Sequence, residues 1–225
     1  MAENLRSVRA SIASAAQSAG RPSDCVTLVA VSKGQEVAAV RAALALGQRD
    51  FGESYPQEGV AKIEALDAPQ ATWHFIGQLQ SNKTRRVAER FQWVHGVDRA
   101  QIAARLSAQR PHYAPPLNVC LQVMLAPEPG KAGVAPENVA ALANEVAGMA
   151  RLKLRGLMCI PPPAEDESTQ RAWFRRMREL LEALNGSGHA LDVLSMGMSA
   201  DYTAAVAEGA THVRIGTAIF GPRPD

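Results

Sequence analysis

The 225-residue sequence contains no long apolar run and has a formal net charge of only +2. No stretch is long and apolar enough to span a bilayer, so we expect no membrane association. The small net charge does not indicate nucleic-acid binding. Residues 1–20 carry Glu3, Arg6 and Arg9 among apolar positions. This pattern is unlike a secretory signal, and we expect a cytoplasmic protein.

Cysteine is also scarce. Cys25, Cys120 and Cys159 are odd in number, far apart and not in any metal-ligand spacing. This usage suits a reducing compartment and predicts neither a disulfide framework nor a metal site. With 47% hydrophobic and 20% charged residues, the composition is that of an ordinary globular protein with a sizeable core.

Short apolar runs alternate with helical patterns along the whole chain. The sequence predicts eight strands, at residues 28–33, 49–52, 72–77, 93–97, 118–125, 154–160, 193–198 and 212–215. This rhythm indicates an α/β protein, a (β/α)₈ TIM barrel forming a single domain over residues 1–225, with an extra N-terminal helix covering the seam. A doubly wound open sheet is the main alternative. It is weaker because no glycine-rich dinucleotide fingerprint follows the first strand.

The first predicted strand ends at Lys33. Its four apolar residues, 28–31, are typical of a strand buried on both faces. A lysine at the rim of an apolar interior loses solvation, which lowers the pKa of its ammonium and allows the amine to form a Schiff base with a carbonyl. The alternative interpretation is a solvated lysine of no chemical role.

Other polar residues follow the predicted strands and would share the same rim of the barrel. They are Glu53, Ser54, Gln78, Asp98, Ser199, Gly216 and Thr217. Barrels often bind phosphate with the loops after strands seven and eight and a short extra helix. A lysine across the rim from such a cradle suits a phosphorylated aldehyde. Alternatively, Ser199 is only a helix N-cap and Gly216 is only a turn residue. Ser81 and Asp98 are likewise predicted to be the N-caps of the helices that follow them.

Arg214 lies inside the last predicted strand, between apolar neighbours. An unpaired guanidinium would be costly to bury, so Arg214 requires a partner. The partner is either a ligand acceptor or a carboxylate of the protein, for which Glu53 and Asp98 are the candidates.

Several sequence blocks together resemble the pyridoxal-phosphate homeostasis protein family. The resemblance covers nearly the whole chain and rests on residues 29–33 (VAVSK), 51–53 (FGE) with 57–58 (QE), 73–77 (WHFIG) with 79–83 (LQSNK), 155–158 (RGLM), 194–199 (LSMGMS) and 213–221 (VRIGTAIFG).

The resemblance implies a barrel similar to the N-terminal domain of bacterial alanine racemase that binds pyridoxal 5′-phosphate (PLP) without known turnover. Lys33 would form the Schiff base, Ser199, Gly216 and Thr217 would hold the phosphate, and Arg214 would face the pyridine nitrogen. An arginine there keeps the ring nitrogen unprotonated and weakens the ring as an electron sink.

The sequence departs from the family pattern near the predicted site. Ser54 stands where asparagine usually follows Phe-Gly-Glu, Gln78 stands where histidine is common, and residues 34–36 lack a proline. Ser54 can still donate a hydrogen bond to the cofactor, with a shorter reach.

Three functions follow as hypotheses. The leading one is a non-enzymatic PLP carrier in vitamin B6 homeostasis, with PLP-dependent apo-enzymes as recipients, and a monomer is expected. The second is a racemase-type enzyme, which needs an acid or base opposite Lys33. Of the three tyrosines only Tyr55 is near the predicted rim, and the racemase's additional domain, which supplies its catalytic tyrosine, is not expected in a chain ending at Asp225. The third is a Schiff-base aldolase of sugar phosphates.

Overall fold

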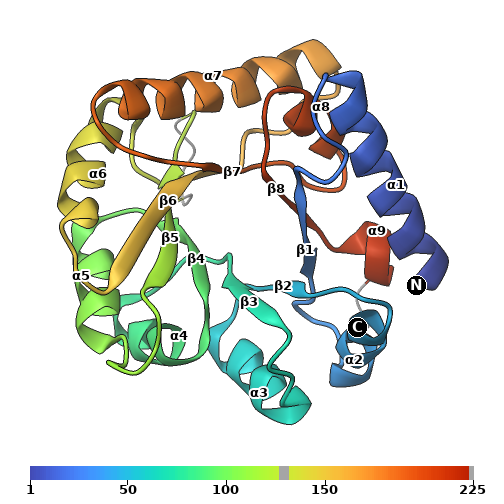
Figure 1. Cartoon of the computed structure of the whole chain (residues 1–225), viewed down its shortest axis with the longest axis horizontal. Coiled ribbons are helices and arrows are strands. Elements are labelled where there is room, and N and C mark those ends of the chain that lie inside the picture. Colours follow the sequence, from blue (N-terminus) through green and yellow to red (C-terminus); the bar gives the residue numbers. More distant parts are fainter. Residues whose placement is uncertain (127–131, 223–225) are drawn as a thin grey trace.

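Eight parallel strands close into a barrel in the computed structural model, which describes residues 1–126 and 132–222. Each strand pairs with its neighbours in chain order, and β1 pairs with β8 to complete the ring (Figure 1). The strands are β1 (Thr27–Val31), β2 (Asp50–Glu53), β3 (Thr72–Phe75), β4 (Trp93–Val97), β5 (Leu117–Val123), β6 (Leu152–Cys159), β7 (Val193–Ser195) and β8 (His212–Ile215).

Helices surround the barrel (Figure 1). They are α1 (Ala2–Ser18), α2 (Val37–Ala45), α3 (Pro56–Leu66), α4 (Thr84–Arg90), α5 (Ala100–Gln109), α6 (Val139–Ala147), α7 (Glu167–Gly186), α8 (Tyr202–Ala207) and α9 (Thr217–Phe220), with 3₁₀ turns η1 (Ser81–Lys83) and η2 (Pro136–Asn138). Helix α1 precedes the first strand and packs against α8 and α9, where Asn4 Nδ2 donates to the carbonyl of Ile219. The predicted (β/α)₈ barrel with an extra N-terminal helix is confirmed.

The strand boundaries follow the predictions closely, and two of the eight strands match residue for residue. The largest difference is at β7, which was predicted to reach residue 198 and ends at Ser195. Gly197 has φ +95°, a left-handed conformation that turns the chain out of the sheet.

The three predicted N-caps are wrong. Helix α8 is preceded by Asp201, whose Oδ1 accepts the N–H of Met198 at 2.6 Å, so Ser199 lies in the turn before it. Helix α5 follows Arg99, and Asp98 is instead ion-paired with that arginine at 2.7 Å. Ser81 is the first residue of η1. In the first two cases a residue nearer the helix start occupies the cap position.

Two apolar cores lie on the two sides of the strands. The larger one fills the space between the barrel and its helices, and a small one contains Trp93, Cys120, Met158 and Val193. Successive side chains alternate between the two faces of a strand, so the second core lies in the barrel lumen. On β8, Val213 and Ile215 join the outer core, which leaves His212 and Arg214 for the lumen.

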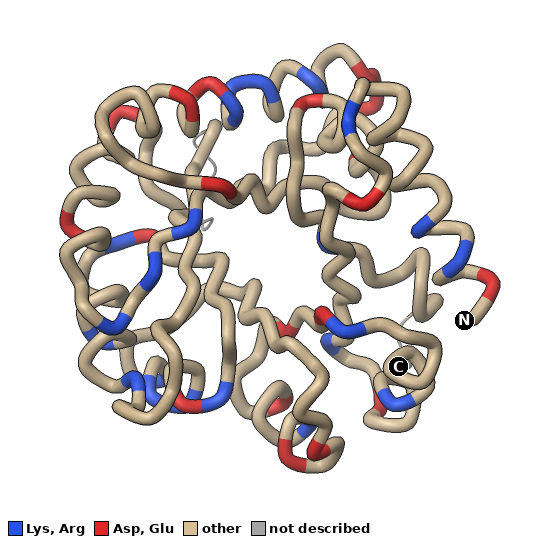
Figure 2. The backbone as a smooth tube through the Cα atoms, in the orientation of Figure 1, with Lys and Arg blue, Asp and Glu red and all other residues tan. Residues whose placement is uncertain are grey.

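Charged residues of both signs are interspersed around the ring of helices, most clearly along α7 (Figure 2). Within residues 1–126 and 132–222, no helix is long and apolar enough to cross a bilayer, and no group of three or more histidine, cysteine or acidic side chains is placed to hold a metal ion. All three cysteines are free.

Candidate functional site

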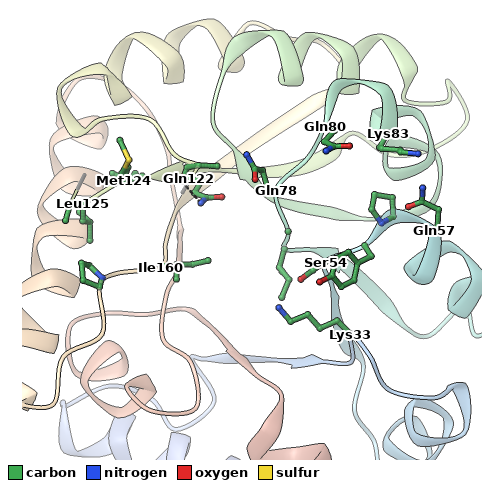
Figure 3. A pocket seen from close by; sticks show the side chains of 18 residues that line it. Lys33, Ser54, Gln57, Gln78, Gln80, Lys83, Gln122, Met124, Leu125 and Ile160 are labelled. Carbon is green, nitrogen blue, oxygen red and sulfur yellow. Dashed lines mark hydrogen bonds between the residues drawn. The ribbon is translucent and has the colours of Figure 1, made fainter. Parts of the chain in front are cut away.

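A cavity of about 660 Å³ opens at the end of the barrel where the strands finish. Lys33, just after β1, reaches into it, and Ser54, just after β2, lines it (Figure 3). This is the rim on which barrel enzymes and ligand-binding barrels carry their functional residues. The two predicted residues are therefore brought together at one cavity.

The cavity wall is mixed in character. One part is polar, with Gln57, Gln80 and Lys83, whereas Met124 and Leu125 lie on the opposite side (Figure 3). No aspartate or glutamate is among the described residues that line it. Such a wall suits a ligand that has anionic or hydrogen-bonding groups beside an apolar body.

Lys33 also borders a second, much smaller recess of about 30 Å³. Gly216 and Thr217 line this recess together with Val31 and Gln35. The proximity follows from barrel closure, because β1 and β8 pair with each other and the segments that follow these two strands leave the sheet side by side. The structure therefore places Lys33 between the large cavity and the residues predicted to hold phosphate.

Ser199 and Arg214 line neither cavity. Ser199 is exposed in the turn before α8. Arg214 is buried, donates from Nη1 to Ser195 Oγ at 2.8 Å and from Nη2 to the carbonyl of Cys159 at 2.8 Å. Neither Glu53 nor Asp98, the two predicted partners, contacts it. The partners are a hydroxyl and a backbone carbonyl on β7 and β6, the two strands before β8 in the ring.

A chain of buried hydrogen bonds runs from Arg214 through the lumen. Ser195 Oγ contacts His95 Nδ1 at 2.6 Å, His95 Nε2 contacts His74 Nδ1 at 2.9 Å, and His74 Nε2 contacts Asp50 Oδ1 at 3.0 Å. Burial lowers the pKa of both histidines, that of His95 far below its usual value. Both are therefore neutral at pH 7. The sequence analysis did not predict this series of hydrogen bonds. Its only mark in the sequence is the alternation of side chains along each strand, which places His74, His95 and Ser195 on the lumen face of three strands.

Glu53 does not face the rim cavity as predicted. It is fully buried on the outer side of β2, where its Oε1 accepts from Ser32 Oγ at 2.6 Å and from Lys62 Nζ at 2.9 Å. Burial raises the pKa of Glu53, and the hydrogen bonds from Lys62 and Ser32 oppose that shift. Lys62 was also missed, although its signal is in the sequence: it lies on the buried stripe of α3, with Gly59 and Leu66.

Comparison with known proteins identifies the family. The family model for the alanine racemase N-terminal domain matches residues 4–224. A pyridoxal phosphate homeostasis protein of Pseudomonas aeruginosa is 56% identical, over 99% of this chain and 96% of its own length. This chain belongs to the pyridoxal phosphate homeostasis protein family. The family member of Escherichia coli K12 is 47% identical, over 99% of this chain and 97% of its own.

Solved structures agree with this membership. PipY of Synechococcus elongatus, a COG0325 family member solved with PLP bound, is 40% identical, with a TM-score of 0.87 over 98% of this chain and 99% of its own. Alanine racemase of Corynebacterium glutamicum is 16% identical, with a TM-score of 0.69 over 98% of this chain and 61% of its own. The homeostasis family therefore shares the racemase barrel fold.

Proposed function

We propose that this protein binds PLP as a Schiff base on Lys33 and carries the cofactor for PLP homeostasis without catalytic turnover. In this reaction the Lys33 amine condenses with the aldehyde of PLP and releases water. The observation that carries the proposal is the position of Lys33, which borders both the large cavity and the recess formed by Gly216 and Thr217.

The residues present fit the chemistry of PLP. The Thr217 hydroxyl and the lysine amine suit a phosphate and an aldehyde, respectively. Arg214 lines neither cavity and already donates to Ser195 and the carbonyl of Cys159, so its contact with the pyridine nitrogen remains a prediction from the family resemblance. A guanidinium only donates hydrogen bonds, which would suit an unprotonated ring nitrogen. Ser54, at the cavity wall, is available to donate a further hydrogen bond, and Ser199 remains a predicted phosphate contact. Support also comes from PipY, which was solved with PLP bound and has 40% of its residues in common with this chain.

The acid and base groups near Lys33 support the absence of turnover. PLP would supply an electron sink when bound, and the predicted contact of Arg214 with its ring nitrogen would weaken that sink. A racemase also needs a second proton carrier. Tyr55 lines the cavity but is 60% exposed, Tyr113 is 91% exposed and outside it, and Tyr202 donates to Ser11. A solvated phenol is poorly placed to hold a proton at a fixed atom.

We further propose a monomeric, cytoplasmic protein that delivers PLP to PLP-dependent apo-enzymes. The three free cysteines support a reducing compartment. The mouth of the cavity gives an incoming amine access to Lys33, which transfer of the aldehyde to another lysine requires.

The test is the visible absorption spectrum of the purified protein with PLP, before and after borohydride, with peptide mass mapping. We expect a yellow Schiff-base band that borohydride traps on Lys33 and that Lys33→Ala abolishes. Lys83→Ala, which removes the other lysine of the cavity, should retain the band. A protein that gains no band with PLP would overturn the proposal and favour the sugar-phosphate aldolase. Steady-state racemisation or exchange of amino-acid protons by the loaded protein would overturn the carrier role.

A further inference from the structure

A buried lysine lies beside the segment that carries Lys33. Lys62 projects from α3, and its side chain is only 5% exposed. All three ammonium hydrogens have acceptors: Glu53 Oε1 at 2.9 Å, Glu58 Oε1 at 2.6 Å and the carbonyl of Ser32 at 2.6 Å. A buried ammonium is tolerated only with such complete pairing.

The contacts of this cluster converge on the two residues that flank Lys33. Ser32 donates its hydroxyl to Glu53 and accepts from Lys62 with its carbonyl. On the other side of Lys33, the N–H of Gly34 donates to Glu58 Oε1 at 2.6 Å. Gly34 has φ +72°, which turns the chain immediately after the lysine. The backbone on both sides of Lys33 is therefore held by side chains of β2 and α3.

The cluster is poorly explained as a source of stability. Buried ion pairs contribute little net stabilisation, because desolvation offsets most of their attraction. In addition, Glu53 Oε2 is buried without a hydrogen-bond partner among the described residues, which is an uncompensated cost. The cluster fixes the two peptide groups on either side of Lys33 despite this cost. We therefore interpret it as a device that holds Lys33 in a defined position.

We propose that Lys62 is a positioning residue for Lys33: through Ser32, Glu53 and Glu58 it fixes the backbone from which the reactive amine projects. The proposal deepens the proposed function, because the geometry matters for attack on an aldehyde carbon. A misplacement of about 1 Å costs such reactions up to about a hundredfold.

The experiment measures the rate of borohydride-trapped labelling at Lys33, mapped by peptide mass, with PLP and separately with formaldehyde, over a range of pH. Lys62→Met keeps the length of the side chain and removes its charge and donors. We expect labelling by both aldehydes to slow by about tenfold or more at every pH, with the midpoint of the pH profile unchanged. Amide hydrogen exchange at Gly34 should accelerate in the ligand-free protein.

Glu58→Ala is the second variant, and it decides the outcome if Lys62→Met does not fold. Glu58 is only partly buried, and its loss removes an acceptor from both Lys62 and Gly34. The matched control is Glu64→Ala, on the same helix, which removes an exposed partner of Arg90. We expect slower Lys33 labelling in Glu58→Ala and an unchanged rate in Glu64→Ala.

Wild-type labelling rates in folded Lys62→Met and Glu58→Ala would overturn the proposal. So would a shifted pH midpoint with an unchanged limiting rate, which would indicate a charge effect instead of positioning. The two aldehydes separate the two proposals. If wild-type protein fails to take up PLP but its formaldehyde labelling at Lys33 still depends on Lys62, the positioning role stands and the PLP function fails.

Discussion

Ser195 accepts a hydrogen bond from Arg214 at 2.8 Å and also lies 2.6 Å from His95 Nδ1. The direction of each proton in this chain of hydrogen bonds follows from its other end, at Asp50. An ionised Asp50 can only accept, so His74 Nε2 carries the proton, and a neutral His74 then accepts at Nδ1 from His95 Nε2. His95 Nδ1 is thereby left as an acceptor for the hydroxyl of Ser195.

The first prediction concerns these tautomers and the hydroxyl. Nitrogen NMR of labelled protein should show His74 and His95 both protonated at Nε2. Ser195→Ala leaves a buried acceptor on His95 and a donor on Arg214 unpaired, which should lower the free energy of unfolding by roughly 1–3 kcal/mol in urea titrations. Ser187→Ala, at an exposed serine whose hydroxyl donates only to the carbonyl of Leu184, should change it by less than about 0.5 kcal/mol. An Nδ1–H tautomer at His95 would contradict the assigned direction.

The second prediction concerns stability at acidic pH. Burial lowers the pKa of His212 from 6.5 to about 3, so the native state stays neutral where the unfolded chain binds a proton. The free energy of unfolding therefore falls as pH drops below 6.5 and continues to fall towards 3, by up to about 1.4 kcal/mol per pH unit for this histidine. Urea titrations of wild type and His212→Asn at about pH 7 and pH 5 measure the effect. The variant should lose about 1–2 kcal/mol less on acidification, and an equal loss in both proteins would contradict the prediction.

The third prediction uses two glycines. A Cβ at Gly77 would overlap the carbonyl oxygen of Ser54 and lie 2.9 Å from its Cα, whereas a Cβ at Gly186 meets nothing within 4 Å. Gly77→Ala must displace the backbone at the cavity wall, which should cost roughly 1–3 kcal/mol of stability and weaken PLP binding. Gly186→Ala, at the end of α7, should be neutral or stabilising by up to about 1 kcal/mol. Thermal unfolding and PLP titration of both variants test this contrast, and equal behaviour would refute it.

The fourth prediction concerns thiol reactivity. Burial raises the pKa of both Cys120 and Cys159 to about 12, so neither forms appreciable thiolate at neutral pH. Cys25 is only partly buried. A thiol-specific reagent at about pH 8 should therefore modify Cys25 first, and the other two only after denaturation. Rapid reaction of all three in the native protein would show that the barrel opens readily.

The strands and helices could be predicted from the sequence because the signals for both, apolar runs and helical periodicity, are local. Apolar runs such as residues 28–31 mark strands that are buried on both faces, and the helical stripes between them leave few alternatives to a barrel. Lys33, Gly216 and Thr217 came together as expected because strand ends share one rim. The exact cap at α8 was not predictable, because Ser199 and Asp201 are both good cap residues and only loop geometry selects between them.

The hydrogen-bond partners of the polar side chains inside the barrel were harder to predict from the sequence. Arg214 was correctly expected to need a partner, but Ser195 and the Cys159 carbonyl belong to strands whose register sequence alone does not give. The carboxylates were the wrong choice because Glu53 faces outwards from β2 and is already paired with Lys62. A shift of one residue along a strand moves a side chain to the opposite face of the sheet, and this decides which polar groups can pair.

Barrel closure has a consequence for how the protein folds. Residues 27–30 of β1 pair with residues 212–215 of β8, so the first strand gains its second neighbour only from the last. Such distant pairing slows folding, because the entropy of closing a long loop is lost before the contact forms. During synthesis on the ribosome, β1 presents an unpaired edge until nearly all of the chain has emerged. The pairing of β1 with β8 also completes the recess that Lys33 shares with Gly216 and Thr217. A ligand of this recess would therefore bind only to fully folded molecules.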